Sequence, residues 1–157
     1  MNTFNFGSAM KTMWDRGAAR EIRDRVGRLT PDRKGQWGRM STQQMVCHLS
    51  ESLKMAIGDL QVAPKHLPLR YPPLKQIVVY VAPFPKNAPT APELIIAATP
   101  RLWSDDIAKL ETLIDRFTAR GSVAQWPEHP AFGRLSRRAW GVLTYRHMDH
   151  HLRQFAG

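Results

Sequence analysis

The chain has 157 residues, of which 43% are hydrophobic and 23% are charged, as in one ordinary globular domain. Its 23 Lys and Arg outnumber its 13 Asp and Glu, so the formal net charge is +10. The longest apolar run, residues 77–81, is far too short to cross a membrane. These numbers argue against wholesale disorder and against a membrane-spanning helix, and we expect one domain over residues 1–157.

Other features of the sequence indicate a reducing compartment. The N-terminus lacks the basic start and the apolar stretch of a secretory signal. The single cysteine, Cys47, rules out an internal disulfide and a paired-cysteine zinc or redox site. We therefore expect a soluble protein of the cytoplasm.

The basic excess has two interpretations. A solvated basic face is the simpler one, because no block of five like charges occurs. The alternative function is that of a non-catalytic basic protein that binds nucleic acid or a protein partner. Its contact surface would be the arginine-bearing segment 15–29, although nucleic acid is not the favoured partner.

The first half of the chain predicts two helices. Residues 15–29 carry apolar side chains at helical spacing. A second helix is predicted over residues 41–57, because Ser41 and Gln44 form a capping-box pattern and Gly58 supplies a stop signal.

The second half predicts a long connection and two further helices. Residues 60–100 hold nine of the 12 prolines, and within them residues 74–81 are interpreted as a short buried helix. Capping patterns predict later helices over residues 104–121 and 136–155. The sequence thus predicts an all-α four-helix bundle with a long proline-rich crossover between the second and third main helices.

The last helix carries histidines at metal-ligand spacing. His147 and His151 are four residues apart, so they share one helix face and can chelate one divalent ion. His150 is three residues from His147, so spacing alone does not choose between His150 and His151. A helical wheel places His151 on the inward stripe with Trp140 and Gln154, and so favours His151.

A third histidine, His48, lies on the apolar face of the second helix, where an unpaired imidazole is unfavourable. Three inward histidines on two helices predict a metal site with open coordination positions, which is the catalytic pattern. Glu51 follows His48 by three residues and is the candidate catalytic base; it can also be a fourth ligand, an acceptor for an imidazole N–H, or a surface acid. Gln154 is expected to orient bound water or to cap the face.

The sequence resembles the DinB superfamily of metalloenzymes. The resemblance rests on the segments MSTQQMVCHLSESLKMAIGD and SRRAWGVLTYRHMDHHLRQF, and within the superfamily the chain is most similar to a subgroup of unknown function. It implies that His48, His147 and His151 hold a divalent transition metal, for which zinc, nickel and iron are all suitable.

The same resemblance implies a homodimer and a low-molecular-weight thiol as a further cofactor. The expected function is that of a metal-dependent enzyme in which the ion activates a thiol or water to act on a small-molecule substrate. The reaction would be that of a thiol-dependent transferase or of a hydrolase.

Overall fold

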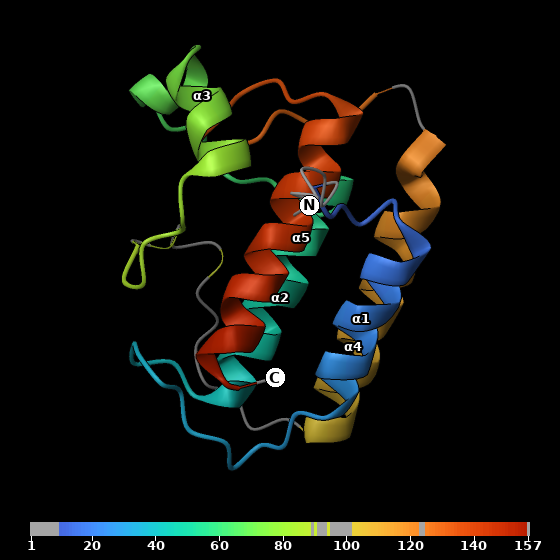
Figure 1. Cartoon of the computed structure of the whole chain (residues 1–157). Helices are drawn as coiled ribbons and strands as arrows, with labels where there is room; N and C mark the ends of the chain where they lie inside the picture. The colour runs from blue at the N-terminus through green and yellow to red at the C-terminus, as the bar shows by residue number, and fades with distance from the viewer. Residues whose placement is uncertain (1–9, 89, 91–93, 95–101, 123–124, 157) are drawn as a thin grey trace, which may run out of the picture.

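A computed structural model of the chain describes residues 10–88, 90, 94, 102–122 and 125–156. The regular secondary structure of these residues is helical, with no strand among them apart from an isolated bridge between His129 and Gly133. The all-α prediction is therefore confirmed for this part of the chain. The longest helices are α1 (Arg16–Gly27), α2 (Thr42–Ile57), α4 (Trp103–Ala119) and α5 (Arg137–Gln154) (Figure 1).

The helix α2 begins and ends where the sequence predicts. The backbone N–H of Gln44 donates to Ser41 Oγ at 3.1 Å, and the Ser41 N–H donates to Gln44 Oε1 at 2.8 Å. Gly58 ends the helix with φ at 88°, a left-handed conformation that favours glycine. These two caps fix the length of α2, and His48 lies buried on it at 6% exposure.

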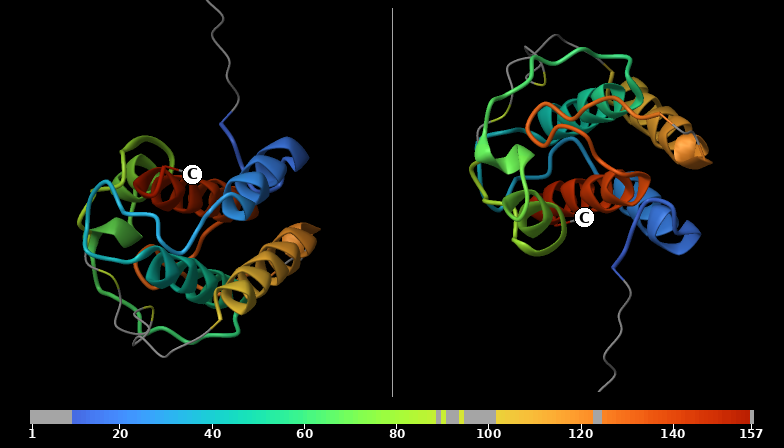
Figure 2. Two further views of the ribbon diagram at one scale, coloured as in Figure 1. Left: turned by 90° about the horizontal axis from the view of Figure 1, so that it is seen from below. Right: turned by 90° about the horizontal axis from the view of Figure 1, so that it is seen from above.

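The four long helices pack as two pairs, α2 with α4 and α1 with α5, and the pairs also contact each other through α1 and α4 and through α2 and α5. The end-on views show this arrangement (Figure 2). One core cluster joins side chains from all four helices, among them Ile22, Leu49, Ile114 and Trp140. No helix in the described ranges has the length and apolar character needed to cross a membrane.

The described part of the connection that follows α2 lies beside α2 and α5 rather than between them (Figures 1 and 2). Its short helical elements are η1 (Pro68–Arg70), α3 (Leu74–Gln76) and the π-helical η2 (Ile77–Val81). The four-helix bundle and its proline-rich crossover stay predictions, because residues 89, 91–93 and 95–101 of that crossover lie outside the described part.

The prediction of a short buried helix over residues 74–81 is half wrong. The segment is helical, but within it only Val79 is buried. Val79 packs with Phe132, Ala139 and Leu143 in a second core cluster, whereas the opposite side of the segment faces outward. Three of its apolar side chains are exposed: Leu74, Ile77 and Val81.

Arg146 of α5 holds this segment in place. Its Nη1 atom donates to the carbonyls of Val78 at 2.8 Å and Val79 at 2.6 Å, and its Nη2 atom donates to the carbonyl of Ala82. Its guanidinium also lies 4.9 Å from the ring centroid of Phe84. A cation at the carbonyl end of a helical segment is favourable, so Arg146 fixes the segment against α5.

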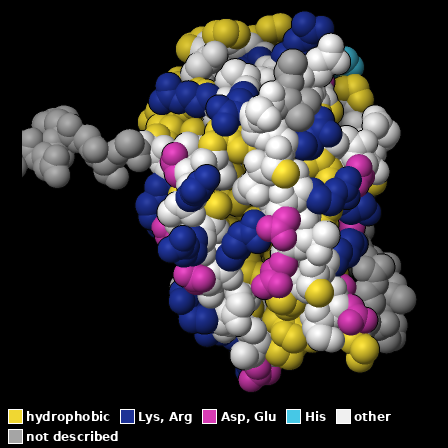
Figure 3. Space-filling model, turned by 90° about the vertical axis from the view of Figure 1, so that its right-hand side faces the viewer, with side chains coloured by type: hydrophobic (Ala, Val, Ile, Leu, Met, Phe, Trp, Pro, Cys, Tyr) yellow, Lys and Arg dark blue, Asp and Glu magenta, His cyan; other side chains and the backbone are white. Residues whose placement is uncertain are grey.

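The face made by α1 and α4 carries basic side chains interspersed with acidic ones (Figure 3). Arg23 pairs with Asp115 at 2.5 Å, and Arg116 pairs with Asp59 at 2.6 Å. On this face the arginine-bearing helix therefore presents mixed charge rather than a continuous basic surface.

The N-terminal segment closes on α5 at Gly141. The backbone N–H of Met13 donates to the Gly141 carbonyl at 3.1 Å, and Trp14 Nε1 donates to the Arg137 carbonyl at 2.8 Å. The Trp14 ring also stacks on Phe117 of α4, with ring centroids 5.0 Å apart. A Cβ on Gly141 would overlap Trp14 Nε1. The position of the Trp14 ring, which contacts both α4 and α5, therefore requires glycine at position 141.

We predict that Gly141→Ala lowers the free energy of unfolding by about 2 kcal/mol, because the overlap outweighs the higher helix propensity of alanine. The matched control is Gly17→Ala in α1, where no atom lies within 4 Å of the added Cβ. The control should raise the free energy of unfolding by up to about 1 kcal/mol. Urea unfolding followed by circular dichroism checks both variants, and equal stabilities would contradict the packing described for Trp14.

Candidate metal centre

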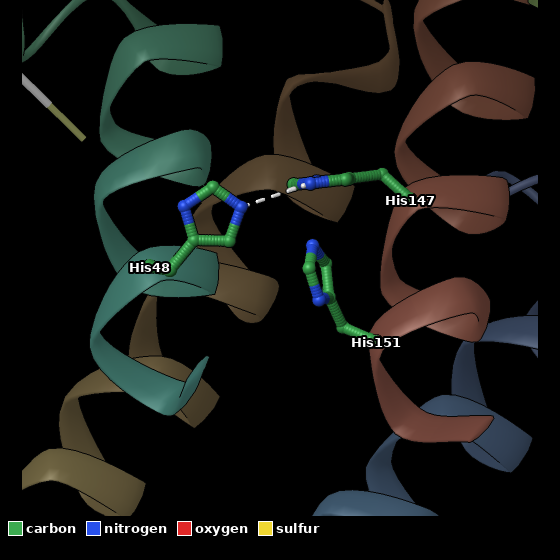
Figure 4. Close-up of side chains that lie close together, drawn as sticks. All are labelled: His48, His147 and His151. Carbon is green, nitrogen blue, oxygen red and sulfur yellow. Dashed lines mark hydrogen bonds between the residues drawn. The ribbon is translucent and has the colours of Figure 1, made fainter. Parts of the chain in front are cut away.

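Three histidine side chains from α2 and α5 converge on one point (Figure 4). The Nε2 atoms of His48 and His147 are 3.1 Å apart, and the ring centroid of His151 lies 4.8 Å from each of the other two. One nitrogen from each ring can be chosen so that all three lie within 4.8 Å of one another. Two nitrogens bound to one tetrahedral zinc ion are about 3.3 Å apart. The spacing of His48 and His147 therefore fits a shared ion.

Gln154 fixes which nitrogen of His151 faces the other two rings. The Nε2 atom of Gln154 donates to the Trp37 carbonyl at 2.7 Å, so its Oε1 atom faces His151 and accepts from Nδ1 at 2.9 Å. With its proton on Nδ1, the His151 ring keeps a lone pair on Nε2. Gly38 makes this contact possible, because its φ is 78° and an added Cβ would lie 2.7 Å from Gln154 Nε2.

The three rings are held in the neutral form that binds metal. Burial lowers the pKa of His48, and it lowers that of His147 well below its usual range, with further contributions from the neighbouring histidines. Burial and the proximity of His48 lower the pKa of His151 to about 4, although its bond to Gln154 opposes the shift. At neutral pH these imidazoles are uncharged, so a metal does not have to displace the second ring proton of an imidazolium.

The cluster forms part of the wall of a cavity of about 1090 Å³. Most of the wall is apolar and comes from α2, α5, the segment after α2 and the loop before α5. The charged side chains that line it are all basic within the described part of the chain: Arg39, Lys65 and Lys86. A cavity of this kind suits a small organic molecule rather than a bare inorganic ion.

The structure does not bring Glu51 to the three histidines. Its carboxylate pairs with Lys54 at 2.9 Å and with Lys109 of α4 at 3.0 Å, and it does not line the cavity. Burial raises its pKa, but the bonds to both lysines outweigh burial and leave the pKa lowered. A carboxylate held in this way joins α2 to α4, which gives Glu51 a structural role between these helices.

His150 lies beside the cluster instead of within it. Its ring centroid is 5.6 Å from that of Trp37 and 5.9 Å from that of Phe84, and it is only partly buried. Since the three converging rings are those of His48, His147 and His151, the geometry favours His151 over His150 as the partner of His147.

The sequence reasoning missed His129, which lines the same cavity. In the sequence it is an isolated histidine in a proline-bearing loop with no partner at metal spacing. Its loop directly precedes α5 and folds over the start of that helix, so that its ring lies 5.4 Å from that of Trp140. The only sign of its position in the sequence was that this loop directly precedes the last helix, and the spacing between histidines does not reveal that.

The family model described as "Protein of unknown function (DUF1569)" matches residues 14–157, so the chain belongs to this family. No curated protein and no solved structure matches the chain. The resemblance to the DinB superfamily is therefore wrong, because the DUF1569 family is distinct from DinB and no DinB family model matches. Facing helices can place histidines together in unrelated proteins. The thiol cofactor and the homodimer were implied by that resemblance alone and lose their support with it.

We predict that Gly38→Ala weakens zinc binding at least tenfold, because the new Cβ displaces Gln154 from His151. The matched control is Gly58→Ala, since Gly58 also has a positive φ, of 88°, but open space around its Cβ position. Both variants should lose about 1 kcal/mol of stability from left-handed strain, and only the first should lose zinc affinity. Calorimetric titration with zinc measures the difference, and equal affinities would exclude this role of Gln154.

We predict that the metal-free protein loses stability as the pH falls below 6.5. Burial lowers the pKa of His129 to about 3 and that of His151 to about 4. The unfolded chain therefore takes up protons that the folded chain excludes, and the free energy of unfolding falls with pH in this range. Urea unfolding between about pH 7 and pH 5 should show a shallower pH dependence for His129→Asn than for the wild type. Parallel curves would contradict the burial of a neutral His129.

Proposed function

We propose that this member of the DUF1569 family is a metal-dependent enzyme, with one divalent transition metal ion held by His48, His147 and His151. The observation that carries the proposal is the convergence of three neutral imidazoles from two facing helices on the wall of a large cavity. Three protein nitrogens leave a coordination position open, and an ion bound there lowers the pKa of water and polarises a carbonyl.

The side chains around the cluster have separate tasks in this proposal. His48 from α2 and His147 from α5 approach from opposite sides, and Gln154 holds His151 with Nε2 toward them. The apolar wall would exclude water from the body of the substrate, which strengthens electrostatic interactions at the site. In the proposed arrangement the long helices form a four-helix bundle, and the proline-rich crossover covers the cavity beside α2 and α5.

Hydrolysis is the reaction class that these residues support best. Water needs only the open coordination position, whereas thiol transfer would need a second bound cofactor. The cationic side chains on the wall suit a substrate that carries negative charge. Zinc, nickel and iron all accept three imidazole ligands, so the proposal does not depend on which of them is bound.

We predict that untagged protein, purified without chelators, contains about one transition metal ion per chain. His48→Ala, His147→Ala and His151→Ala should each lose it, because two imidazoles hold an ion far less tightly than three. The matched controls are His150→Ala, whose ring lies beside the cluster, and His66→Ala, whose side chain is exposed. Elemental analysis and zinc titration measure both sets.

If the alanine variants of His48, His147 and His151 bind the ion as tightly as the wild type does, the proposed metal site is contradicted. The enzymatic part of the proposal has its own readout, which is the hydrolysis of a panel of p-nitrophenyl esters and phosphates. The rate should disappear with chelation and return when the metal is restored. Equal rates for the metal-loaded and metal-free protein would contradict the enzymatic role.

A further inference from the structure

The tautomer of His129 is fixed by its own loop. Its Nδ1 atom accepts from the backbone N–H groups of Ala131 at 3.1 Å and Phe132 at 3.3 Å. Since both partners are donors, Nδ1 must carry the lone pair, and the proton of the neutral ring is on Nε2. The His129 ring therefore presents a fixed N–H donor on the edge opposite its loop backbone.

The ring has little freedom to turn away. Two backbone bonds of 2.8 Å link His129 and Gly133 and close the loop. The His129 ring centroid lies 4.8 Å from that of Phe132 and 5.4 Å from that of Trp140. Burial, with a smaller contribution from the charge of Arg70, lowers the pKa of His129 to about 3, so the ring stays neutral at physiological pH.

The Nε2–H group of His129 has no partner among the described residues. A polar donor in a largely apolar wall is unfavourable until it meets an acceptor. No described acidic side chain lines the cavity, so the protein itself offers no carboxylate there. An oxygen atom of a bound molecule is the acceptor that this position lacks.

The backbone of Lys65 lies at the same end of the cavity. The backbone N–H of Lys65 donates to the carbonyl of Pro130 at 2.8 Å, which ties the Lys65 segment to the residue after His129. Lys65 is partly buried and lines the cavity. An N–H donor and an ammonium group on the wall of one cavity together favour an oxygen with negative charge over a neutral one.

Along α5 this end of the cavity lies about two helical turns from the histidine cluster. Trp140, which the His129 ring contacts, and His147 are seven residues apart on α5, or about 10 Å along the helix. Leu143 and Thr144 lie between them on α5 and line the cavity, and Phe132 packs with Leu143, so this part of the wall is largely apolar. A ligand that reaches both ends therefore needs an apolar body between its charged oxygen and the group at the cluster.

We propose that the cavity binds an apolar organic carboxylate, whose oxygen accepts a hydrogen bond from Nε2–H of His129 and whose charge is met by Lys65. The proposal deepens the proposed function by naming its substrate class, and it rests on that function for the ion at the other end of the cavity. The carboxylate site itself does not require the ion, so it can be tested in metal-free protein.

The test is a calorimetric titration of the metal-free full-length protein with octanoate, and with octan-1-ol as the neutral probe. His129→Asn is the sharpest variant, because the asparagine Oδ1 can replace Nδ1 as the acceptor for the loop while the Nε2–H donor is lost. It should weaken octanoate binding at least tenfold, whereas His66→Asn, at an exposed histidine, should leave it unchanged. Lys65→Met should reduce the preference for octanoate over octan-1-ol.

Two further measurements separate this proposal from the metal site and from a folding defect. His129→Asn should still bind zinc, and His151→Ala should still bind octanoate, so either proposal can fail alone. In wild-type protein with ¹⁵N-labelled histidine, the Nε2–H resonance of His129 should shift on saturation with octanoate. No octanoate binding by the wild type, wild-type affinity in His129→Asn, or an unmoved resonance would each overturn the proposal.

Discussion

The enclosure of three imidazole rings between α2 and α5 is the constraint on which the rest of the site depends. His48 and His147 face each other with both Nε2 atoms 3.1 Å apart, and only one of the two can donate to the other. The Nε2 lone pair of His151 faces the same space, and burial disfavours a proton on any of the rings. One divalent ion satisfies all three nitrogens together, whereas the single proton between His48 and His147 joins only those two.

Several residues around the histidine cluster hold it in place. Gln154 sets the tautomer of His151, and the glycine at position 38 leaves the room that Gln154 needs. Arg146 directly precedes His147 on α5 and fixes the segment that lies against this helix. Two adjacent residues of α5 thus supply a candidate metal ligand and anchor part of the cavity wall. At the other end His129 is neutral and fixed as a donor. In the proposed function the cavity has a metal-binding end and an anion-binding end, joined by a largely apolar wall.

The sequence predicted what local rules determine. The capping box at Ser41 and the stop at Gly58 gave the ends of α2, and the wheel placed His151 on the inner face of α5. It could not predict contacts made by distant elements. Glu51 was expected near the histidines, but Lys109 from α4 binds its carboxylate. His129 was passed over because the fold, not its spacing, brings its loop to the cavity. Family membership was misjudged, since a spacing that suits metal binding does not identify ancestry.

The most direct test of the central claim is anomalous diffraction at the zinc edge from crystals of the zinc-loaded protein. We expect one strong peak between α2 and α5, bonded to Nε2 of His48, His147 and His151 at about 2.0–2.1 Å. The bond from Gln154 to Nδ1 of His151 should persist beside it. Zinc bound in stoichiometric amount at another place, or a cluster without zinc in the loaded crystals, would contradict the account.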